Sequence, residues 1–551
     1  MKTIRFILLT CFFLLVNDLF GSPFDMILTG DPVLEDLRVL SLESGKPFLS
    51  FTPPLSPAEL RNFIDTIDES ALSQPATEAY YRVLKRLQPQ TPLSFSQGIF
   101  TGFLNVNAAL EGKVRFNSDI SWYPRYPKIT PFLSFPLRLS FADYVQLYIE
   151  PNIAVKPARY GEGIGDVNIP LDVYHFTAPY LPWRAFAAAG GPWWNFQLGR
   201  DRLYWGTSQT GSLTFSDNFP YFDFARLSLF SSSVKYSIIV NQLPLELSSD
   251  LFPLPGEPAY PGGWDDPENL RRTTQRYYYL HRLDFSLFNR VSIGIMEGLM
   301  VGNSPIEIRY LNPLVIFHSL FSWRDYDKWE PAARDNPGRG DMNGSFLSLE
   351  INWNIIEPLS FYGQFSMNEF ALPAELNDQP NQPPNAFGFI AGLQLTKAFN
   401  TWGSVFFLEF IYTDPYLSIL STPFASFIHV DDQGKYFIGY PRDTIAVTLG
   451  TRFFNRDTLS FSGRFSWISS GEHNRDELKW DWRMSPETRN ERTPSGTAEN
   501  KLVLSLAAQW KPFSYLSLKG EITGIVSLNN NHNPGINETG GQASLCVGFH
   551  Y

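Results

Sequence analysis

The chain ends in GGQASLCVGFHY, residues 540–551, and this stretch decides the fold. Apolar side chains occupy every second position, at Ala543, Leu545, Val547, Phe549 and Tyr551. A spacing of two is typical of a β-strand with one apolar face. Chain ends of soluble proteins usually fray, so a strand that runs to an aromatic last residue indicates a terminus held in a sheet. We therefore expect the last strand to pair with the first, which leaves no unpaired sheet edge.

The same period of two runs through the chain from residue 96 onward. In LSFSGRFSWI, residues 459–468, apolar residues and a glycine alternate with serines and Arg464. In FLSLEINW, residues 346–353, Glu350 falls on the polar side and Trp353 ends the apolar side. A half-buried sheet in a soluble protein would also alternate. Aromatic residues at the strand ends, with charges on the other face, favour a barrel with an aromatic girdle outside and a polar interior.

The connections between these segments alternate between short and long. Short turns fall at 230–234, 288–291, 354–359, 397–401, 455–458 and 511–514, and long polar connections lie between them. Outer-membrane barrels have short turns in the periplasm and long loops outside. Counting back from the C-terminus gives about 18 strands, with a range of roughly 16 to 20 because residues 113–123 could form a strand of their own. We therefore predict an all-β, transmembrane, antiparallel β-barrel over residues 96–551.

The N-terminal part follows other patterns. Residues 1–22 are typical of a signal peptide, with Lys2 and Arg5 before an apolar run too short for a spanning helix. Residues 23–95 show helical spacing, with candidate helices at 32–40, 57–67 and 76–87. In PLSPAELRNFI, residues 54–64, Ser56 and Glu59 form a capping box with Pro57 at the first helical position. We expect a small periplasmic helical region over residues 23–95.

Composition excludes several classes of protein. The 551 residues carry a formal net charge of −11, which excludes the basic face that a nucleic-acid-binding protein needs. Of the two cysteines, Cys11 lies in the predicted signal peptide, so Cys546 has no partner for an internal disulfide after cleavage. No later apolar run reaches the roughly 18 residues of a transmembrane helix, whereas the alternating strands of a barrel escape such a search.

Two stretches resemble the capsule-assembly Wzi family of outer-membrane proteins. They are LGRDRLYWGTSQTGSLTFSDNFP, residues 198–220, and EIRYLNPLVIFHSLF, residues 307–321. The counterparts of family-typical residues are Gly199, Arg200, Trp205, Gly206, Gly211, Ser212, Leu213, Ser216, Asn218, Pro220, Arg309, Asn312 and Pro313. Residues 34–40, Gly45 and PPLSPAEL, residues 53–60, are similar to the start of the family's helical domain. The first stretch departs from the family at Asp217 and in NFPYFD, residues 218–223, which bears more on a shared ligand than on a shared fold.

The resemblance implies a barrel of about 18 strands with a periplasmic helical bundle, acting as a lectin in capsule or exopolysaccharide assembly. We therefore expect the protein in the outer membrane of a diderm bacterium, with membrane lipid and surface or capsular polysaccharide as partners. The barrel-assembly machinery is a further expected partner, through the C-terminal strand that ends in Tyr551. A porin-like channel for ions or small solutes is the alternative, motivated by the charged inner face.

Six residues are candidates for binding polysaccharide: Arg200, Arg202, Tyr204, Trp205, Arg309 and Asn312. Arginine presents a planar fork that matches sugar carboxylates and phosphates. Tryptophan and tyrosine present flat apolar faces with a polar edge, which suit carbohydrate rings. The alternative is structural: the arginines pair with acids inside the barrel and brace a plug, and Trp205 belongs to the girdle. Arg464, Lys519 and Glu521 are expected to form ion pairs inside the barrel.

Catalysis and metal binding receive little support. The seven histidines are dispersed, and none has zinc-ligand spacing or stands beside a nucleophile motif. The acidic pairs Asp265–Asp266 and Asp431–Asp432 could hold Ca²⁺, but solvated loop charge explains them as well. The loop tryptophans could stack on sugars or pack against other loops; they are Trp264, Trp323, Trp329 and Trp480. We predict no enzymatic activity, no metal site and no cofactor.

Overall fold

The structure is a computed structural model. It describes residues 24–551 except for 89–92, 98, 118–119, 121–129, 143, 156–164, 171–182, 219–220, 245–275, 303–304, 316, 318–342, 370–383, 421–422, 432–433 and 474–490. The predicted signal peptide, residues 1–22, lies outside the described residues, as do large parts of the predicted long connections.

The N-terminal region is helical, as its spacing predicts. Its described helices are α2 (Val33–Ser44), α3 (Pro57–Ile64), the short 3-10 helix η1 (Glu69–Ala71) and α4 (Gln74–Arg86). The predicted capping box is confirmed: Ser56 N donates to Glu59 Oε1 at 3.0 Å, and Glu59 N donates to Ser56 Oγ at 3.4 Å. The apolar helix faces pack into one buried cluster, which includes Leu37, Leu40, Leu60, Phe63, Ala79 and Val83. Within the described residues, no helix combines the length and the apolar character needed to cross a membrane.

The rest of the regular structure is almost entirely β. The strands are β1 (Leu93–Gln97), β2 (Phe100–Leu104), β3 (Asn107–Phe116), β4 (Leu133–Ser134), β5 (Leu137–Phe141), β6 (Val145–Ile149), β7 (Asn152–Ile153), β8 (Gly165–Val167), β9 (Ala185–Gly190), β10 (Trp194–Asp201), β11 (Tyr204–Trp205), β12 (Phe215–Ser216), β13 (Phe222–Phe230), β14 (Val234–Leu243), β15 (Arg276–Leu287), β16 (Val291–Gly302), β17 (Asn343–Ile356), β18 (Leu359–Glu369), β19 (Ala386–Phe399), β20 (Trp402–Thr413), β21 (Ile428–Asp431), β22 (Gly434–Phe437), β23 (Thr444–Asn455), β24 (Leu459–Ser470), β25 (Glu499–Phe513), β26 (Leu516–Leu528) and β27 (Glu538–His550). Two further 3-10 helices, η4 (Ile308–Leu311) and η6 (Asn530–His532), lie in connections. Lys113 lies inside β3, which ends at Phe116.

The long strands pair in chain order and antiparallel. Starting at β9, the order is β10, β13, β14, β15, β16, β17, β18, β19, β20, β23, β24, β25, β26 and β27. The last strand, β27, then pairs with β3, from Gly541 opposite Phe116 to His550 opposite Asn107. Val106 N donates to Tyr551 O at 2.7 Å, and Tyr551 N donates to Val106 O at 2.9 Å. The terminal stretch therefore pairs with an early strand, down to its last residue.

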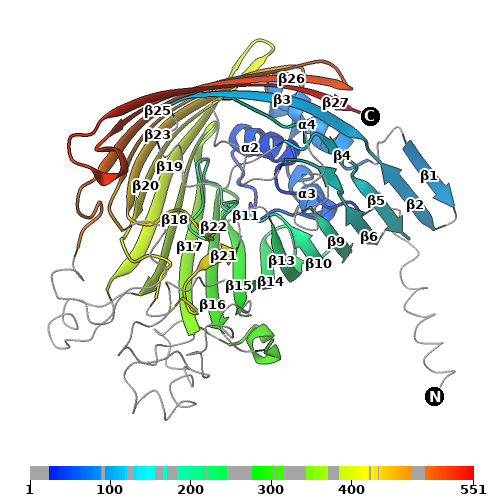
Figure 1. Ribbon diagram of the computed structural model, residues 1–551. Coiled ribbons are helices and arrows are strands. Elements are labelled where there is room, and N and C mark those ends of the chain that lie inside the picture. Colours follow the sequence, from blue (N-terminus) through cyan, green and yellow to red (C-terminus); the bar gives the residue numbers. More distant parts are fainter. Residues whose placement is uncertain are drawn as a thin grey trace.

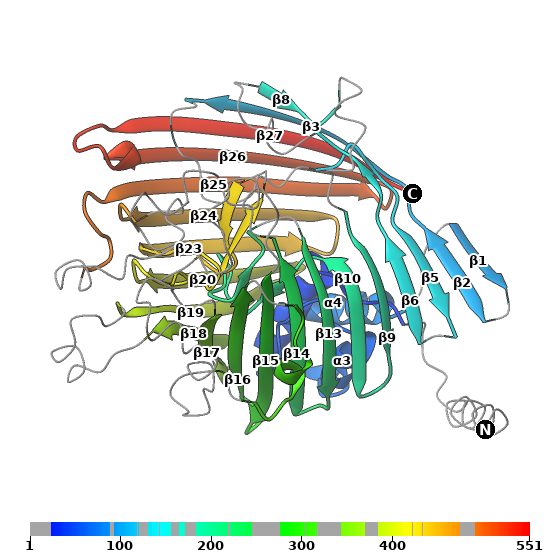
Figure 2. The same cartoon turned by 60° about the horizontal axis from the view of Figure 1, so that its bottom comes forward.

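The sheet curves around the three α-helices (Figures 1 and 2). We call the sheet face that contacts these helices the inner face, and the opposite face the outer face. Along β10, Asn195 and Gln197 are buried on the inner face, whereas Phe196 and Leu198 are exposed on the outer face. This alternation is the period of two that the sequence shows, with large apolar side chains outside and polar ones inside.

The helical region lies at the end of the sheet where the turns are short. Asn354, near the end of β17, donates from Nδ2 to Ser41 O at 2.7 Å. Arg456, in the turn after β23, lies 3.5 Å from Glu78 of α4. The long connections leave the sheet at its other end.

Candidate functional site

The stretch that resembles the family most closely folds in among the inner-face side chains. We call residues 202–218 the inward segment; it follows β10 and contains β11 and β12, which pair with each other. At Gly206 the backbone φ is 136°, a conformation that favours glycine, and its N–H donates to Phe51 O of the helical region at 2.9 Å. Thr29 Oγ1 donates to Arg202 O at 2.8 Å. The inward segment therefore contacts the helical region directly.

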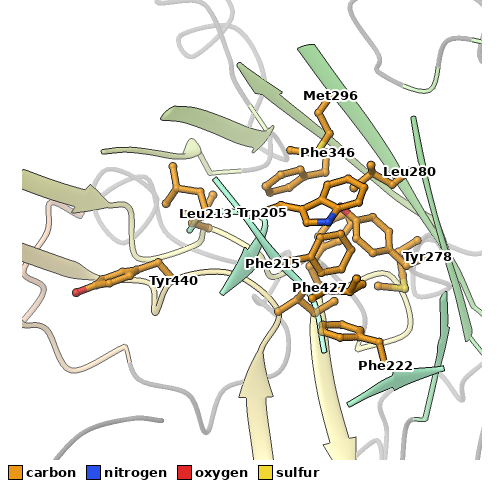
Figure 3. Packing of buried hydrophobic residues seen from close by; sticks show 14 of the residues in the cluster. Trp205, Leu213, Phe215, Phe222, Tyr278, Leu280, Met296, Phe346, Phe427 and Tyr440 are labelled. Atoms are coloured by element: carbon orange, nitrogen blue, oxygen red, sulfur yellow. The ribbon is translucent and has the colours of Figure 1, made fainter. Parts of the chain in front are cut away.

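Trp205 anchors the inward segment in a large apolar cluster (Figure 3). Its side chain is fully buried and meets the ring of Phe215 edge-on, with centroids 5.1 Å apart. The Arg282 guanidinium lies 5.9 Å from its ring centroid. Neighbouring strands supply Phe222, Tyr278, Leu280, Met296 and Phe346, and connections supply Leu213, Phe427 and Tyr440. In this structure Trp205 has no face open to a ligand.

A buried carboxylate on β20 fixes the next residues of the inward segment. Glu409 is 1% exposed and accepts hydrogen bonds from Ser208 Oγ at 2.7 Å, Gln209 N at 2.8 Å and Thr210 N at 3.2 Å. Tyr362 OH of β18 donates to the same carboxylate at 2.7 Å. These donors satisfy a charge that would otherwise be costly to bury.

A second buried charge cluster joins strands, inward segment and helical region. Arg282 of β15 donates to Asp284 at 2.7 Å and to Glu350 of β17 at 3.0 Å. Ser50, between α2 and α3, donates to Asp284 Oδ2 at 2.9 Å. Thr207 of the inward segment donates to Glu350 Oε1 at 3.3 Å. All three parts therefore share one hydrogen-bonded network.

The start of α3 is held by inner-face side chains of β10, β13 and β14. Lys235 of β14 forms an ion pair with Glu59, and the two side chains are 2% and 6% exposed. Asn195 Nδ2 donates to Glu59 Oε1 at 3.0 Å, and Arg226 Nη1 donates to Thr52 O at 3.3 Å. Burial opposes ionisation of Glu59, but Lys235 and the hydrogen bonds outweigh it and hold the pKa of Glu59 below its ordinary value.

A second connection also packs on the inner face. It runs from Asp414 to Asp443, contains β21 and β22, and meets the inward segment where Ser216 N donates to Ile438 O at 2.9 Å. Arg276 of β15 supports it by donating to Pro423 O at 2.8 Å and Ser426 O at 2.9 Å. Burial raises the pKa of Asp414 to about 6, although Tyr412 donates to its carboxylate at 2.7 Å.

The candidates on β10 and in the inward segment differ in accessibility. Arg200 lies on the outer face and forms a two-pronged ion pair with Asp223, at 2.8 and 2.7 Å. Arg202 is half-buried and pairs with Asp217, the residue at which the stretch departs from the family. Both arginines pair with an acid, but Arg200 does so on the outer face and not inside the sheet, where the structural alternative placed the pairing.

Tyr204 and the second stretch complete the set of candidates. Tyr204 is half-buried, and its hydroxyl donates to Ser208 O at 2.6 Å. Arg309 is exposed, pairs with Glu307 at 2.5 Å and lies over the ring of Tyr310. Asn312 is exposed and accepts a hydrogen bond from Leu314 N at 3.1 Å. The structure does not bring these two residues together with the candidates of the inward segment, because they lie on the outer face of β14–β16.

The other charge predictions have mixed outcomes. Lys519 and Glu521 lie 3.6 Å apart on β26, whereas Arg464 lies 5.9 Å from the ring centroid of Phe407. Among the residues that the structure describes, no group of three or more acidic, histidine or cysteine side chains could hold a metal ion. Outside the described residues lie Trp264, Trp323, Trp329, Trp480, Asp265, Asp266 and Asp432.

Sequence reasoning missed the residues that hold the inner network together. Lys235 and Glu409 are single charges in otherwise uncharged strands, and Arg282 and Asp284 are two of the charges in β15; all four lie at inner-face positions. Such charges inside a strand are a usable signal, because burying a charge requires a partner. The partner itself is not visible in the sequence: Ser208 and Glu409 are 201 residues apart.

Comparisons with known proteins agree with this architecture. The family model described as "Capsule assembly protein Wzi" matches residues 133–533. The solved structure of Escherichia coli Wzi, described as an outer-membrane carbohydrate-binding β-barrel involved in group 1 capsule assembly, is similar with a TM-score of 0.58 and 14% identity over 95% of this chain and 98% of that chain.

More distant structural likenesses also occur. Pseudomonas aeruginosa OprD and OpdL each share 9% identity over 82% of this chain, with TM-scores of 0.39 and 0.40 and coverage of 95% and 98% of their own chains. No curated protein matches the chain. Because the family model covers well over half of its length, the chain belongs to the capsule assembly protein Wzi family.

Proposed function

We propose that the chain is an outer-membrane β-barrel that binds or anchors a surface or exported polysaccharide. The observation that carries this proposal is the family match over residues 133–533. It is supported by the shared fold with Escherichia coli Wzi, which is itself described as a carbohydrate-binding barrel. The proposed role requires no catalytic residue, metal or cofactor.

The proposed barrel closes through the pairing of β27 with β3. We count 18 strands for the proposed barrel, taking β2 with β3, β4 with β5 and β6 with β7 as one strand each and leaving out the short β1 and β8, which pair with β2 and β3. The described pairings support this count. An even number is typical of single-chain outer-membrane barrels. Membrane lipid would cover the outer face, whose large apolar side chains are exposed.

The proposed orientation places the helical region, residues 23–95, in the periplasm. It is supported by the position of these helices at the short-turn end, because outer-membrane barrels have their short turns on the periplasmic side. In this orientation, the strand ends that the long connections join face the cell exterior. The barrel-assembly machinery is a proposed partner through the strand that ends in Tyr551.

We propose that the polysaccharide contacts the six candidates in unequal ways. Arg309 and Asn312 are exposed, and Arg309 offers its guanidinium to an acidic sugar without unfolding any buried contact. Arg200 is also accessible, and Arg202 and Tyr204 would need the inward segment to adjust. Trp205 acts indirectly, by fixing the shape of the inward segment.

Binding of purified surface polysaccharide to the detergent-solubilised protein tests the proposal. We expect Arg309→Gln to weaken binding of an acidic polysaccharide by about tenfold, because a charge-assisted hydrogen bond contributes roughly 1.5–3 kcal/mol. Arg290→Gln is the matched control, because Arg290 is an equally exposed arginine beside a glutamate, but at the short-turn end. Absence of any binding by the wild-type protein, with polysaccharide from its own cell, would contradict the proposed function.

A porin-like channel is the second candidate, and one observation favours it. On β26, the inner-face side chains of Lys519 and Glu521 remain 57% and 36% exposed. The described residues of the helical region and of the inward segment therefore do not cover this part of the inner face. Conductance across a planar bilayer separates the two functions. A steady open current supports the channel, and a silent barrel that binds polysaccharide supports the lectin.

A further inference from the structure

The connection after β16 lies against the outer face of the sheet. We call residues 305–315 together with Phe317 the outer segment; it contains η4, the green helical turn beside the end of β16 in Figure 1. Tyr310 and Phe317 are buried in a cluster with outer-face residues of β14, β15 and β16, namely Val240, Tyr279, Leu299 and Val301. The segment therefore covers part of the outer face, which is exposed on the neighbouring strands.

Two polar side chains on the outer face hold this segment. His281 of β15 and Glu297 of β16 are opposite each other in the strand register. The Nε2 atom of His281 lies 2.9 Å from Tyr310 O, and Phe317 N donates to Glu297 Oε2 at 3.0 Å. Polar groups on a lipid-facing surface are costly unless they have partners, and here the backbone of the outer segment supplies them.

Six N–H groups of the outer segment have acceptors within the protein. Glu307 N donates to the hydroxyl of Tyr279 at 2.7 Å. The N–H groups of Tyr310, Asn312, Leu314, Val315 and Phe317 also donate to protein oxygens. A surface loop in water needs no such provision, because water accepts from free N–H groups. In lipid, irregular backbone is tolerated only where its polar groups are satisfied by protein.

The side chains that point away from the sheet are apolar. Ile306 is 52% exposed, and Ile308 and Leu314 are each 80% exposed. They continue the apolar outer face of the same strands, where Leu283 is 40% exposed and Ile295 is 39% exposed. Arg309 stands among them with its charge paired to Glu307, an arrangement that suits the boundary between acyl chains and headgroups.

We propose that the outer segment inserts into the outer leaflet and that its partner is the acyl chains of membrane lipid. This inference rests on the proposed barrel, because only a membrane-embedded sheet presents its outer face to lipid. A second copy of the chain is the competing occupant. Lipid is favoured because the apolar side chains are continuous with the lipid-facing strands, and because six N–H groups of the segment already have acceptors within the protein.

Spin labels at single cysteines test the proposal in lipid vesicles. Cys546→Ser provides the background, and labels are placed at Ile308→Cys, at Leu283→Cys on the outer face of β15, and at Ser232→Cys in a short turn. Collision with oxygen, which concentrates in lipid, is compared with collision with a water-soluble nickel chelate. We expect the labels at 308 and 283 to have the same collision frequencies. Both should collide often with oxygen, and both should collide much less often with the nickel chelate than the label at 232 does.

Each other outcome overturns a defined part of the reasoning. Nickel collision at 308 as frequent as at 232, while 283 stays protected, places the outer segment in water and overturns the insertion alone. Low collision with both reagents at 308, together with spin–spin broadening between labels, assigns the surface to a second copy. Nickel collision at 283 as well as at 308 overturns the barrel and with it the proposed function.

Discussion

The ion pair between Lys235 and Glu59 is expected to lock the helical region onto the inner face. Glu59→Gln removes the negative charge but keeps the side-chain shape, and glutamine also serves in a capping box. The variant leaves Lys235, whose side chain is 2% exposed, without its ion-pair partner, while its hydrogen bond to the hydroxyl of Thr52 at 3.0 Å remains. Removing one member of a buried ion pair typically costs about 3–5 kcal/mol, because the other charge stays buried without compensation.

Hydrogen–deuterium exchange of residues 33–86 measures this loss directly. Because exchange of protected amides follows the population of opened molecules, a loss of about 3–5 kcal/mol should speed exchange of α3 by roughly 150- to 5,000-fold. Glu78→Gln is the matched control: Glu78 pairs at 3.5 Å with Arg456, whose side chain is 67% exposed, and such surface pairs contribute only about 0–1 kcal/mol. The double variant Glu59→Gln, Lys235→Met should recover part of the loss, because it removes the stranded charge.

The pH dependence of wild-type exchange provides a second measure of the same ion pair. The pKa of Glu59 is lower in the folded protein than its ordinary value, so the stability that this group contributes is present at neutral pH. It is lost as the pH falls below the ordinary carboxyl range. Equal exchange of α3 in Glu59→Gln and Glu78→Gln at pH 7 would refute the reasoning.

Three further variants test other parts of the structure. Trp205→Ala should loosen the inward segment by about 3–5 kcal/mol, seen as faster proteolysis within residues 202–218, with Trp205→Phe much less affected. Asp414, with its pKa raised to about 6, should favour docking of its connection below about pH 4 and lose that contribution as the pH rises through 6; Asp414→Asn should abolish this dependence in exchange corrected for intrinsic rates. Deleting Tyr551 removes both backbone hydrogen bonds to Val106 and should lower the yield of the heat-modifiable folded form on gels, whereas Tyr551→Phe should not.

Local patterns in the sequence predicted the strands and helices well. The alternating stretch at 459–468 lies within β24, and the capping box at Ser56 marks the start of α3. Both follow from short-range physics: alternation records which face of a strand is buried, and capping satisfies the first N–H groups of a helix. The pairing partner of the last strand was also predictable, because an exposed edge is costly.

The long-range contacts of the candidate site were not predictable in the same way. Trp205 has a side chain of the type that binds sugars, yet it is fully buried because the chain turns inward at Gly206. The ion pair of Arg202 with Asp217 lies within one connection, but the donors around Glu409 come from about 200 residues away. The outer position of Arg309 depends on the contacts that His281 and Glu297 make with its segment. That these two polar residues lie side by side on an apolar face can be recognised only once the strand register is known.

The placement of the helical region constrains the order in which the molecule is built. This region precedes the sheet in the chain, yet its partners extend from Arg138 on β5, which lies 3.1 Å from Asp25, to Arg452 on β23, which lies 3.2 Å from Glu35. Contacts with such wide sequence separation form late in folding. We therefore expect docking of the helical region to be among the last steps of folding, after the strands that hold it have paired. Until that step Lys235 and Arg226 would stay hydrated, so docking is also the step that removes water from around these two charges.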